Sequence, residues 1–357
     1  MPSAHALQAA RAIVDEHGED SLSPFILRPD KAFEFAAGGV LAYRVIGRTA
    51  VVSGDPVAPD GATPDVLAHF LDAAHQRGCR VVLYGSSTRH LERYRTMGLR
   101  AVCVGEEAVV DPARFTLEGR AVRKLRQSTH RIERRGWHIV AREGREIDVG
   151  LEAEIDTVED AWRAERHRMI GFAMGMGEFE RGVPARDLYL LGRSPEGDLR
   201  AVMRFIRHRG KLSLDTMRRV GDTPNGLNEA LVCKALEAAR DGGVAEVSLN
   251  YAGLAHLVRD PAALGPGRRL VLRLLGRRFQ MERLVRFNDK FSPEWRPRHL
   301  VYESRISLCG SVLRVLQAEG YIGHRQGPAT HELLRPEPLP LPRLRPIETQ
   351  VDGRGSR

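Results

Sequence analysis

Apolar and polar positions in the first half of the chain alternate in a pattern typical of an α/β fold. The segment VLAYRVIGRTAVVSGDP, residues 40–56, has apolar runs on either side of Ile46-Gly47-Arg48, which predicts two strands joined by a turn. Positions with helical spacing follow from about residue 63 to residue 77, and Gly78 suits the end of that helix. The apolar runs RVVLYG and LRAVCVG then predict strands on either side of a short helix in STRHLERYRTMG.

The second half repeats this order of elements. Residues 187–217 read as three strands, with the turn SPEG after the first. The helix predicted in NGLNEALVCKALEAARDGG again ends in glycine, and the strand AEVSLNYA follows it. This shared order predicts two copies of one mixed α/β unit, although many α/β proteins have the same order without a duplication.

Two further segments combine apolar positions with many basic residues. Residues 118–137 place Val122, Leu125 and Ile132 on one face of a helix, and arginine or lysine covers much of the remainder. Residues 267–287 alternate aliphatic clusters with pairs of arginine. From about residue 326 the chain is rich in proline and has no period, which predicts an extended or disordered tail.

Length, charge and cysteine content narrow the class of protein. A chain of 357 residues favours two domains, and its net charge of +9 attracts nucleic acid, anionic lipid or acidic substrates. A GC-rich genome is the alternative reason for the many arginines. Neither a signal-peptide core nor an apolar run long enough for a membrane span occurs, so we expect any lipid contact to be peripheral. The cysteines lack metal-ligand spacing and are expected to be reduced and buried: Cys79, Cys103, Cys233 and Cys309.

The stretch LSLDTMRRVGDTPNGLNEALV, residues 212–232, passes from an apolar strand through a glycine-containing loop into a helix. Asp215 and Arg218 lie at the strand, where a charge is costly unless it is paired or employed. They can pair with each other or face a cleft, and a structural ion pair is the simpler alternative. In an acetyltransferase-like (GNAT) fold this segment receives an anionic or carbonyl-bearing donor. The loop fits the acyl-CoA pattern only loosely, because Pro224 lacks an amide that a pyrophosphate needs.

A second candidate segment is RFNDKFSPEWRPRHLVY, residues 286–302. Lys290 stands between Phe287 and Phe291, and a tryptophan and two arginines follow closely. A lysine desolvated by aromatic rings suits an anion or a developing oxyanion. A surface lysine at the entry of a strand is the alternative.

Six motifs follow one another along residues 25–325: GDP (54–56), GEEAVVD (105–111), FTLEGRAVRKLRQ (115–127), LDTMRR (214–219), PNGLNEAL (224–231) and RFNDKFSPEWRPR (286–298). In sequence and order they resemble the aminoacyl-phosphatidylglycerol synthases, best known as lysylphosphatidylglycerol synthase, and specifically their cytosolic catalytic domain. The resemblance implies an α/β (α+β) fold of two tandem GNAT-like units with mixed central sheets. The expected bounds are a helical segment at 1–24, a first GNAT-like domain at 25–135, a second with the catalytic motifs at 136–325, and the tail at 326–357.

The reaction that the resemblance implies moves an aminoacyl ester from the 3′ ribose of tRNA to a lipid hydroxyl, without a cofactor or metal. Motif matches assign catalysis to Asp215, Arg218 and Lys290. We expect Asp215 to hold the donor's α-ammonium or orient the attacking hydroxyl, Arg218 to hold a phosphate or fix Asp215, and Lys290 to stabilise the oxyanion or the lipid phosphate. Further candidates for substrate binding are Asn225, Glu229, Asn250, Trp295 and Arg298.

The expected partners are an aminoacyl-tRNA and an anionic membrane lipid contacted from the inner face of the cell membrane by a cytoplasmic protein. The best-known family members carry a flippase that spans the membrane, or a lysyl-tRNA synthetase. The 357 residues contain neither, so a separate flippase or an acceptor that needs no flipping is expected. Candidate contacts for tRNA or lipid lie in the two basic segments: Arg123, Lys124, Arg126, Arg273 and Arg277. A solvated helix face is the alternative for these residues.

Two departures from the family pattern leave the transferred amino acid and the acceptor open. YAGLAHL follows Asn250 where many members have Gly-x-Ala-Pro-Leu, and His299 replaces a commoner tyrosine. Three alternatives therefore stand beside transfer to a lipid. They are transfer from the same donor to a soluble amine or peptide, an acyl-CoA N-acetyltransferase, and a non-catalytic nucleic-acid-binding protein.

Overall fold

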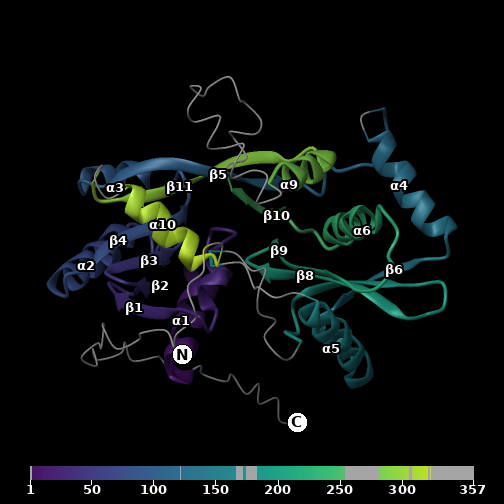
Figure 1. Ribbon diagram of the computed structural model, residues 1–357, viewed down its shortest axis with the longest axis horizontal. Coiled ribbons are helices and arrows are strands. Elements are labelled where there is room, and N and C mark those ends of the chain that lie inside the picture. Colours follow the sequence, from purple (N-terminus) through teal and green to yellow (C-terminus); the bar gives the residue numbers. More distant parts are fainter. Residues whose placement is uncertain are drawn as a thin grey trace, which may run out of the picture.

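The computed structural model describes residues 2–120, 122–165, 172–173, 183–253, 281–304, 308–320 and 322. In this part of the chain the strands form one mixed sheet of eleven strands, in the order β1-β2-β3-β4-β11-β5-β10-β9-β8-β7-β6 (Figure 1). The strands are β1 (Ala32–Ala36), β2 (Gly39–Ile46), β3 (Thr49–Ser53), β4 (Arg80–Ser86), β5 (Arg100–Val110), β6 (His138–Glu143), β7 (Leu188–Arg193), β8 (Leu199–His208), β9 (Lys211–Arg219), β10 (Glu246–Gly253) and β11 (Glu294–Tyr302).

Helices cover both faces of this sheet. The α-helices are α1 (Ala4–His17), α2 (Thr63–Gln76), α3 (Leu91–Thr96), α4 (Arg123–Arg134), α5 (Val149–Ala164), α6 (Leu227–Asp241), α9 (Met281–Asn288) and α10 (Leu308–Ala318). Short 3-10 turns are η1 (Ser23–Leu27), η2 (Gly144–Glu146) and η4 (Asp289–Phe291).

The first half contains the elements that the apolar pattern predicts. Gly47 lies between β2 and β3 with a φ of 62°, a value that a glycine adopts without strain. Helix α2 buries Val66, Leu67 and Phe70 against one face of β2 to β4. Helix α10 packs Val315 and its neighbours against the other face, so the sheet lies between two helical layers here.

The second half contains the predicted strands β7 to β10 and helix α6, but also α5, which the apolar pattern did not predict. The apolar residues of α5 are separated by several acidic ones, which obscures its period. Ile155, Val158 and Trp162 nevertheless pack against β7 and β8. Helices α4 and α6 cover the opposite face, so β8 and β9 are buried from both sides (Figure 1).

Strand β11 joins the two halves of the sheet. Although it comes from the C-terminal part of the described chain, it lies between β4 and β5 and is antiparallel to both. Its pairing with β5 extends from Glu294 to Tyr302. The domain bounds expected from the sequence remain a prediction, and the two expected units share one continuous sheet.

The expectation of buried cysteines is wrong for two residues. Cys79 and Cys233 are buried, but Cys103 is half-buried and Cys309 is exposed. Cys309 lies off the face of α10 that Val315 and Ala318 bury. Among the described residues, no helix is long and apolar enough to cross a membrane. Arg273, Arg277 and the predicted tail lie outside the described residues.

Candidate active site

The predicted catalytic pair lies on β9, in the middle of the second half. Asp215 and Arg218 are both buried. The register between β8 and β9 shifts beside them, because Arg204 faces Thr216 whereas Phe205 faces Leu214. Asp215 is therefore the additional residue of a β-bulge, a feature that redirects a side chain out of the regular alternation.

Asp215 lies between two arginine side chains. Its Oδ1 accepts a hydrogen bond of 3.3 Å from Nη2 of Arg28, and its Oδ2 is 3.7 Å from Nη1 of Arg204. Arg204 also donates from Nε to Oδ2 of Asp187 at 2.8 Å. Burial opposes the charge on Arg204, but Asp215 and Asp187 outweigh it and raise the arginine's pKa above its ordinary value. The two arginines thus hold the Asp215 carboxyl group in one orientation.

Arg218 has partners of its own on α5. Its Nε lies 3.3 Å from Oε2 of Glu159, and the guanidinium carbon lies 3.5 Å from the centre of the Trp162 ring. Burial raises the pKa of Glu159, although Arg218 opposes that effect. No direct contact joins Asp215 to Arg218 among the described side chains, so they are neighbours on β9 rather than an ion pair. We call Arg28, Glu159, Asp187, Arg204, Asp215 and Arg218 the Asp215 cluster.

Asn250 lies beside this cluster in a conformation that is rare for a residue other than glycine. Its φ is 89°, and the register between β10 and β5 shifts at this point. Its Nδ2 is 3.4 Å from the carbonyl oxygen of Leu214, the residue before Asp215. Its Oδ1 accepts from the backbone amide of Tyr251 at 2.7 Å. Backbone strain of this kind costs about 1–3 kcal/mol and concentrates at functional sites.

A further group of buried charges adjoins Arg28. Lys31 donates to Oδ1 of Asp30 at 3.2 Å and to the carbonyl oxygen of Phe25 at 3.1 Å. Burial lowers the pKa of Lys31 to about 8, although Asp30 opposes the shift. Glu319, which follows α10, accepts hydrogen bonds from the backbone amides of Phe172 and Ala173. Burial raises the pKa of this carboxyl to about 7.

Lys290 lies apart from the Asp215 cluster, in η4. Its Nζ is 2.6 Å from Oε1 of Glu229 in the first turn of α6, and 5.7 Å from the centre of the Phe287 ring. The expectation of a desolvated lysine is wrong, because the Lys290 side chain is 46% exposed. Phe291 is buried in the core and Phe287 packs against that core, so the rings lie beneath the lysine rather than around it.

Asn225 and Trp295, two further candidates, take part in contacts between elements. The carbonyl oxygen of Asn225 accepts a hydrogen bond of 3.1 Å from Nη2 of Arg131 on α4. The indole nitrogen of Trp295 donates to Oδ1 of Asp289 at 3.1 Å. Asn225 and Glu229 therefore lie at the same end of α6, and Lys290 contacts that end through Glu229.

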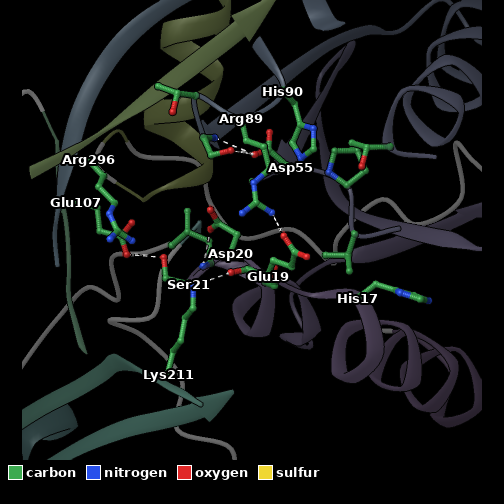
Figure 2. Close-up of a pocket in the computed structure, with 18 of the residues that line it drawn as sticks. His17, Glu19, Asp20, Ser21, Asp55, Arg89, His90, Glu107, Lys211 and Arg296 are labelled. Atoms are coloured by element: carbon green, nitrogen blue, oxygen red, sulfur yellow. Dashed lines mark hydrogen bonds and ion pairs between the residues drawn. The ribbon is translucent and has the colours of Figure 1, made fainter. Parts of the chain in front are cut away.

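Arg298 belongs to a different region, a polar cavity of about 930 Å³. This buried arginine donates to Oε2 of Glu107 at 3.1 Å, to Oδ2 of Asp20 at 2.8 Å and to the hydroxyl of Ser21 at 2.9 Å. Burial alone would raise the pKa of Asp20, but the Arg298 guanidinium outweighs burial and lowers it. Figure 2 shows Asp20, Ser21 and Glu107 together on one side of the cavity.

The cavity also contains residues to which the sequence analysis gave no role. Asp55 accepts hydrogen bonds from the backbone and hydroxyl of Ser87 and from the hydroxyl of Tyr94. His90 lies near it in Figure 2. Asp55 and Glu107 belong to the motifs GDP and GEEAVVD. These motifs could have identified both residues as candidates from the sequence. Among the described residues, no cluster of histidine, cysteine or carboxylate side chains is placed to hold a metal ion.

The structure thus separates the predicted residues into three groups. Asp215, Arg218 and Asn250 lie on β9 and β10, and Lys290, Glu229 and Asn225 surround the N-terminus of α6. Trp295 and Arg298 line the cavity. Arg123 and Lys124 are exposed on α4, whereas Arg126 donates to the carbonyl oxygens of Leu117 and Gly119 and so holds the preceding loop.

Comparison with known proteins identifies the family. Residues 11–302 match the family model described as the C-terminal part of phosphatidylglycerol lysyltransferase. The chain belongs to the phosphatidylglycerol lysyltransferase family. Membership in this family confirms the resemblance found in the motifs.

Curated relatives in this family are longer proteins. The lysylphosphatidylglycerol biosynthesis bifunctional protein LysX of Rhodococcus jostii is 31% identical over 324 residues, which is 88% of this chain and 29% of that protein. LysX of Mycobacterium marinum is 34% identical over 328 residues, again 88% of this chain and 29% of the relative. The chain thus spans less than a third of these relatives.

Solved structures from the phosphatidylglycerol lysyltransferase family have the same fold. The C-terminal domain of a putative lysylphosphatidylglycerol synthetase from Agrobacterium fabrum has a TM-score of 0.75 at 25% identity and covers 89% of this chain and 98% of its own. L-PGS from Bacillus licheniformis has a TM-score of 0.73 at 26% identity, with coverage of 87% and 95%. FemX shares only the fold, at 9% identity and a TM-score of 0.50, with coverage of 87% and 99%. The expected α/β class with a mixed central sheet is confirmed.

Proposed function

We propose that the chain transfers an aminoacyl group, lysyl or a similar one, from an aminoacyl-tRNA to a hydroxyl of a membrane lipid such as phosphatidylglycerol. The observation that carries this proposal is the Asp215 cluster. Removing several charges from water is unfavourable, and apolar residues of similar volume often stabilise a protein as well or better. A buried, bulged strand that holds Asp215 and Arg218 in the middle of a sheet is therefore better explained by chemistry than by stability.

The proposed reaction exchanges one ester for another. The lipid hydroxyl attacks the aminoacyl carbonyl carbon, the bond to the ribose oxygen breaks, and the hydroxyl proton ends on that ribose oxygen. Because the ester is already activated, the protein mainly has to position both substrates and stabilise the oxyanion. Asp215, oriented by Arg28 and Arg204, would hold the α-ammonium group of the donor or align the attacking hydroxyl.

Arg218 and Lys290 have different parts in this proposal. Arg218 is held by Glu159 and Trp162, so it would present a fixed positive charge beside Asp215 to a phosphate of either substrate. Lys290 is 46% exposed, so it would be accessible to an oxyanion or the lipid phosphate in exchange for Glu229. The protein would act at the inner face of the cell membrane, with a separate flippase where the product must reach the other leaflet.

Incubation with charged tRNA tests the proposal. The tRNA carries labelled amino acids, the acceptor is a set of mixed bacterial lipids, and organic extraction separates the product. We expect label in the lipid phase with the wild type and a loss of at least a hundredfold with Asp215→Asn. The matched control is Arg80→Ala, a change at an exposed arginine that begins β4. Absence of lipid label, with label instead on an added amine or peptide, would contradict a lipid acceptor.

A further inference from the structure

Helix α4 presents a continuous basic face. Its twelve residues include one acidic side chain, Glu133. Arg123, Lys124, Arg131 and Arg134 of the helix, and Arg135 directly after it, are exposed. At 100° per residue these five side chains fall within an arc of about 120°, whose centre lies about 130° around the helix from Leu125 and Ile132. Among the described carboxylates, none forms an ion pair with any of the five.

The apolar side of α4 packs against the core of the protein, and this limits which kind of partner the exposed side can bind. Leu125 and Ile132 are buried in the core that α4 shares with α6 and β7 to β10. A helix that lies on a membrane inserts its apolar side between the lipids. Because α4 has its apolar side packed inward, the exposed side offers charge without an apolar anchor. Arginine, which makes up four of the five cations, binds phosphate through two parallel hydrogen bonds.

The position of α4 links this face to the candidate active site. Arg131 donates to the carbonyl oxygen of Asn225, and Gly226, with a φ of 101°, lies against Ser128 of α4. Any side chain at Gly226 would collide with the Ser128 hydroxyl. Helix α6 begins directly after this contact, and Glu229 in its first turn holds Lys290. Arg131 of the basic face and Lys290 therefore both contact residues at the N-terminal end of α6. Figure 1 shows α4 and α6 as neighbours.

We infer that the exposed basic face of α4 binds the phosphate backbone of RNA and so guides the donor tRNA toward the N-terminus of α6. This inference rests on the proposed function for the identity of the RNA. The binding would be largely independent of base sequence, because arginine–phosphate contacts read no bases. It would also weaken steeply with salt, because each neutralised phosphate releases condensed counterions.

The test measures binding of uncharged tRNA by fluorescence anisotropy between about 0.05 and 0.2 M salt. The variant is Arg123→Ala/Arg134→Ala, since alanine preserves the helix. The matched control is Arg80→Ala/Arg100→Ala, which removes the same charge from exposed arginines that begin β4 and β5. We expect the α4 variant to bind roughly tenfold more weakly, with a salt slope smaller by about 1 to 2, and the control to bind like the wild type. Arg123→Lys/Arg134→Lys should recover most of the lost affinity.

Three results would overturn the inference: unchanged tRNA binding by the α4 variant, an equal loss in the control, or a loss of binding to phosphatidylglycerol vesicles with tRNA binding intact. Thermal unfolding of each variant checks that the fold is retained. Transfer assays separate this inference from the proposed function. If the wild type binds tRNA through α4 but labels no lipid, the proposed function fails and the inference stands. If lipid is labelled and the α4 variant keeps the wild-type KM for charged tRNA, the inference fails and the function stands.

Discussion

The Asp215 cluster and the pair of Lys290 with Glu229 place catalytic candidates in opposite environments. Asp215 and Arg218 are withdrawn from water among opposite charges, whereas the Lys290 side chain is 46% exposed. Removing one partner from a buried ion pair costs about 3–5 kcal/mol, but an exposed pair contributes about 0–1 kcal/mol. We therefore expect substitutions in the cluster to change activity and stability together, and substitutions at Lys290 to change activity alone.

Arg218→Ala should destabilise the fold by about 3–5 kcal/mol and abolish transfer, because Glu159 would stay buried without its partner. Denaturant unfolding followed by tryptophan fluorescence measures the first effect. The double variant Arg218→Met/Glu159→Leu replaces the pair by apolar side chains and should recover most of the stability but no transfer. Recovery of both would show that Arg218 only supports the fold.

Glu319 should make stability fall as the pH rises. Its folded pKa of about 7 lies above the ordinary value of 4.5 for a glutamate, so the native state binds the proton more tightly than the unfolded chain. The stabilisation is complete below about pH 4.5 and is lost as the pH rises through 7, a change of about 3 kcal/mol from this group. Glu319→Gln should flatten the pH dependence of unfolding in this window, which lies below the pKa of about 8 of Lys31. If the free energy of unfolding of Glu319→Gln kept the same slope against pH, the raised pKa of Glu319 would be contradicted.

Asp215→Asn should cost about 1–3 kcal/mol, because Arg28 and Arg204 would face a neutral amide. Transfer to lipid should fall at least a hundredfold. Asp187→Asn is the matched control, since Asp187 is also buried and also pairs with Arg204. Both variants should unfold at similar denaturant concentrations, and only Asp215→Asn should lose most of its kcat. An equal loss of kcat in the two variants would show that Asp215 only positions Arg204 and has no catalytic role of its own.

Lys290→Ala should change the free energy of unfolding by about 1 kcal/mol or less, because the pair with Glu229 is partly exposed. If Lys290 stabilises the oxyanion, transfer should still fall about a hundredfold or more. Lys234→Ala is the control: Lys234 is 44% exposed and pairs with Glu237 on the same helix, α6. If both substitutions had a similar small effect on transfer, Lys290 would not be a catalytic residue.

The sequence predicts local elements well where the apolar period is clear. The turn at Gly47, the helices α2 and α6 and the strands β7 to β10 are present where they were expected. Helix α5 was missed because acidic residues separate Ile155, Val158 and Trp162, and its apolar face becomes clear only against β7 and β8. The neighbours of β11 could not be inferred, because strand pairing over such a distance leaves no local signal.

For the candidate site, the sequence indicated which residues are unusual but not what they contact. Asp215 and Arg218 stood out because charges interrupt an apolar strand, and both are buried as that pattern suggests. Their partners Arg28, Arg204 and Glu159 come from other elements of the chain, so spacing could not identify them. Lys290 was misjudged for a related reason. The aromatic neighbours were visible in the sequence, but the direction in which they pack was not.

The place of β11 has a consequence for how the chain reaches its native state. Strands β4 and β5 cannot meet their shared neighbour until the residues from Glu294 to Tyr302 have been synthesised. At roughly 5–20 residues per second, that delay after β5 is on the order of ten to forty seconds. During this interval the edges of β4 and β5 that later pair with β11 lack a partner, and unpaired strand edges are templates for aggregation. Expression at low temperature or with abundant chaperones should therefore improve the yield of this protein more than that of a chain with local strand order.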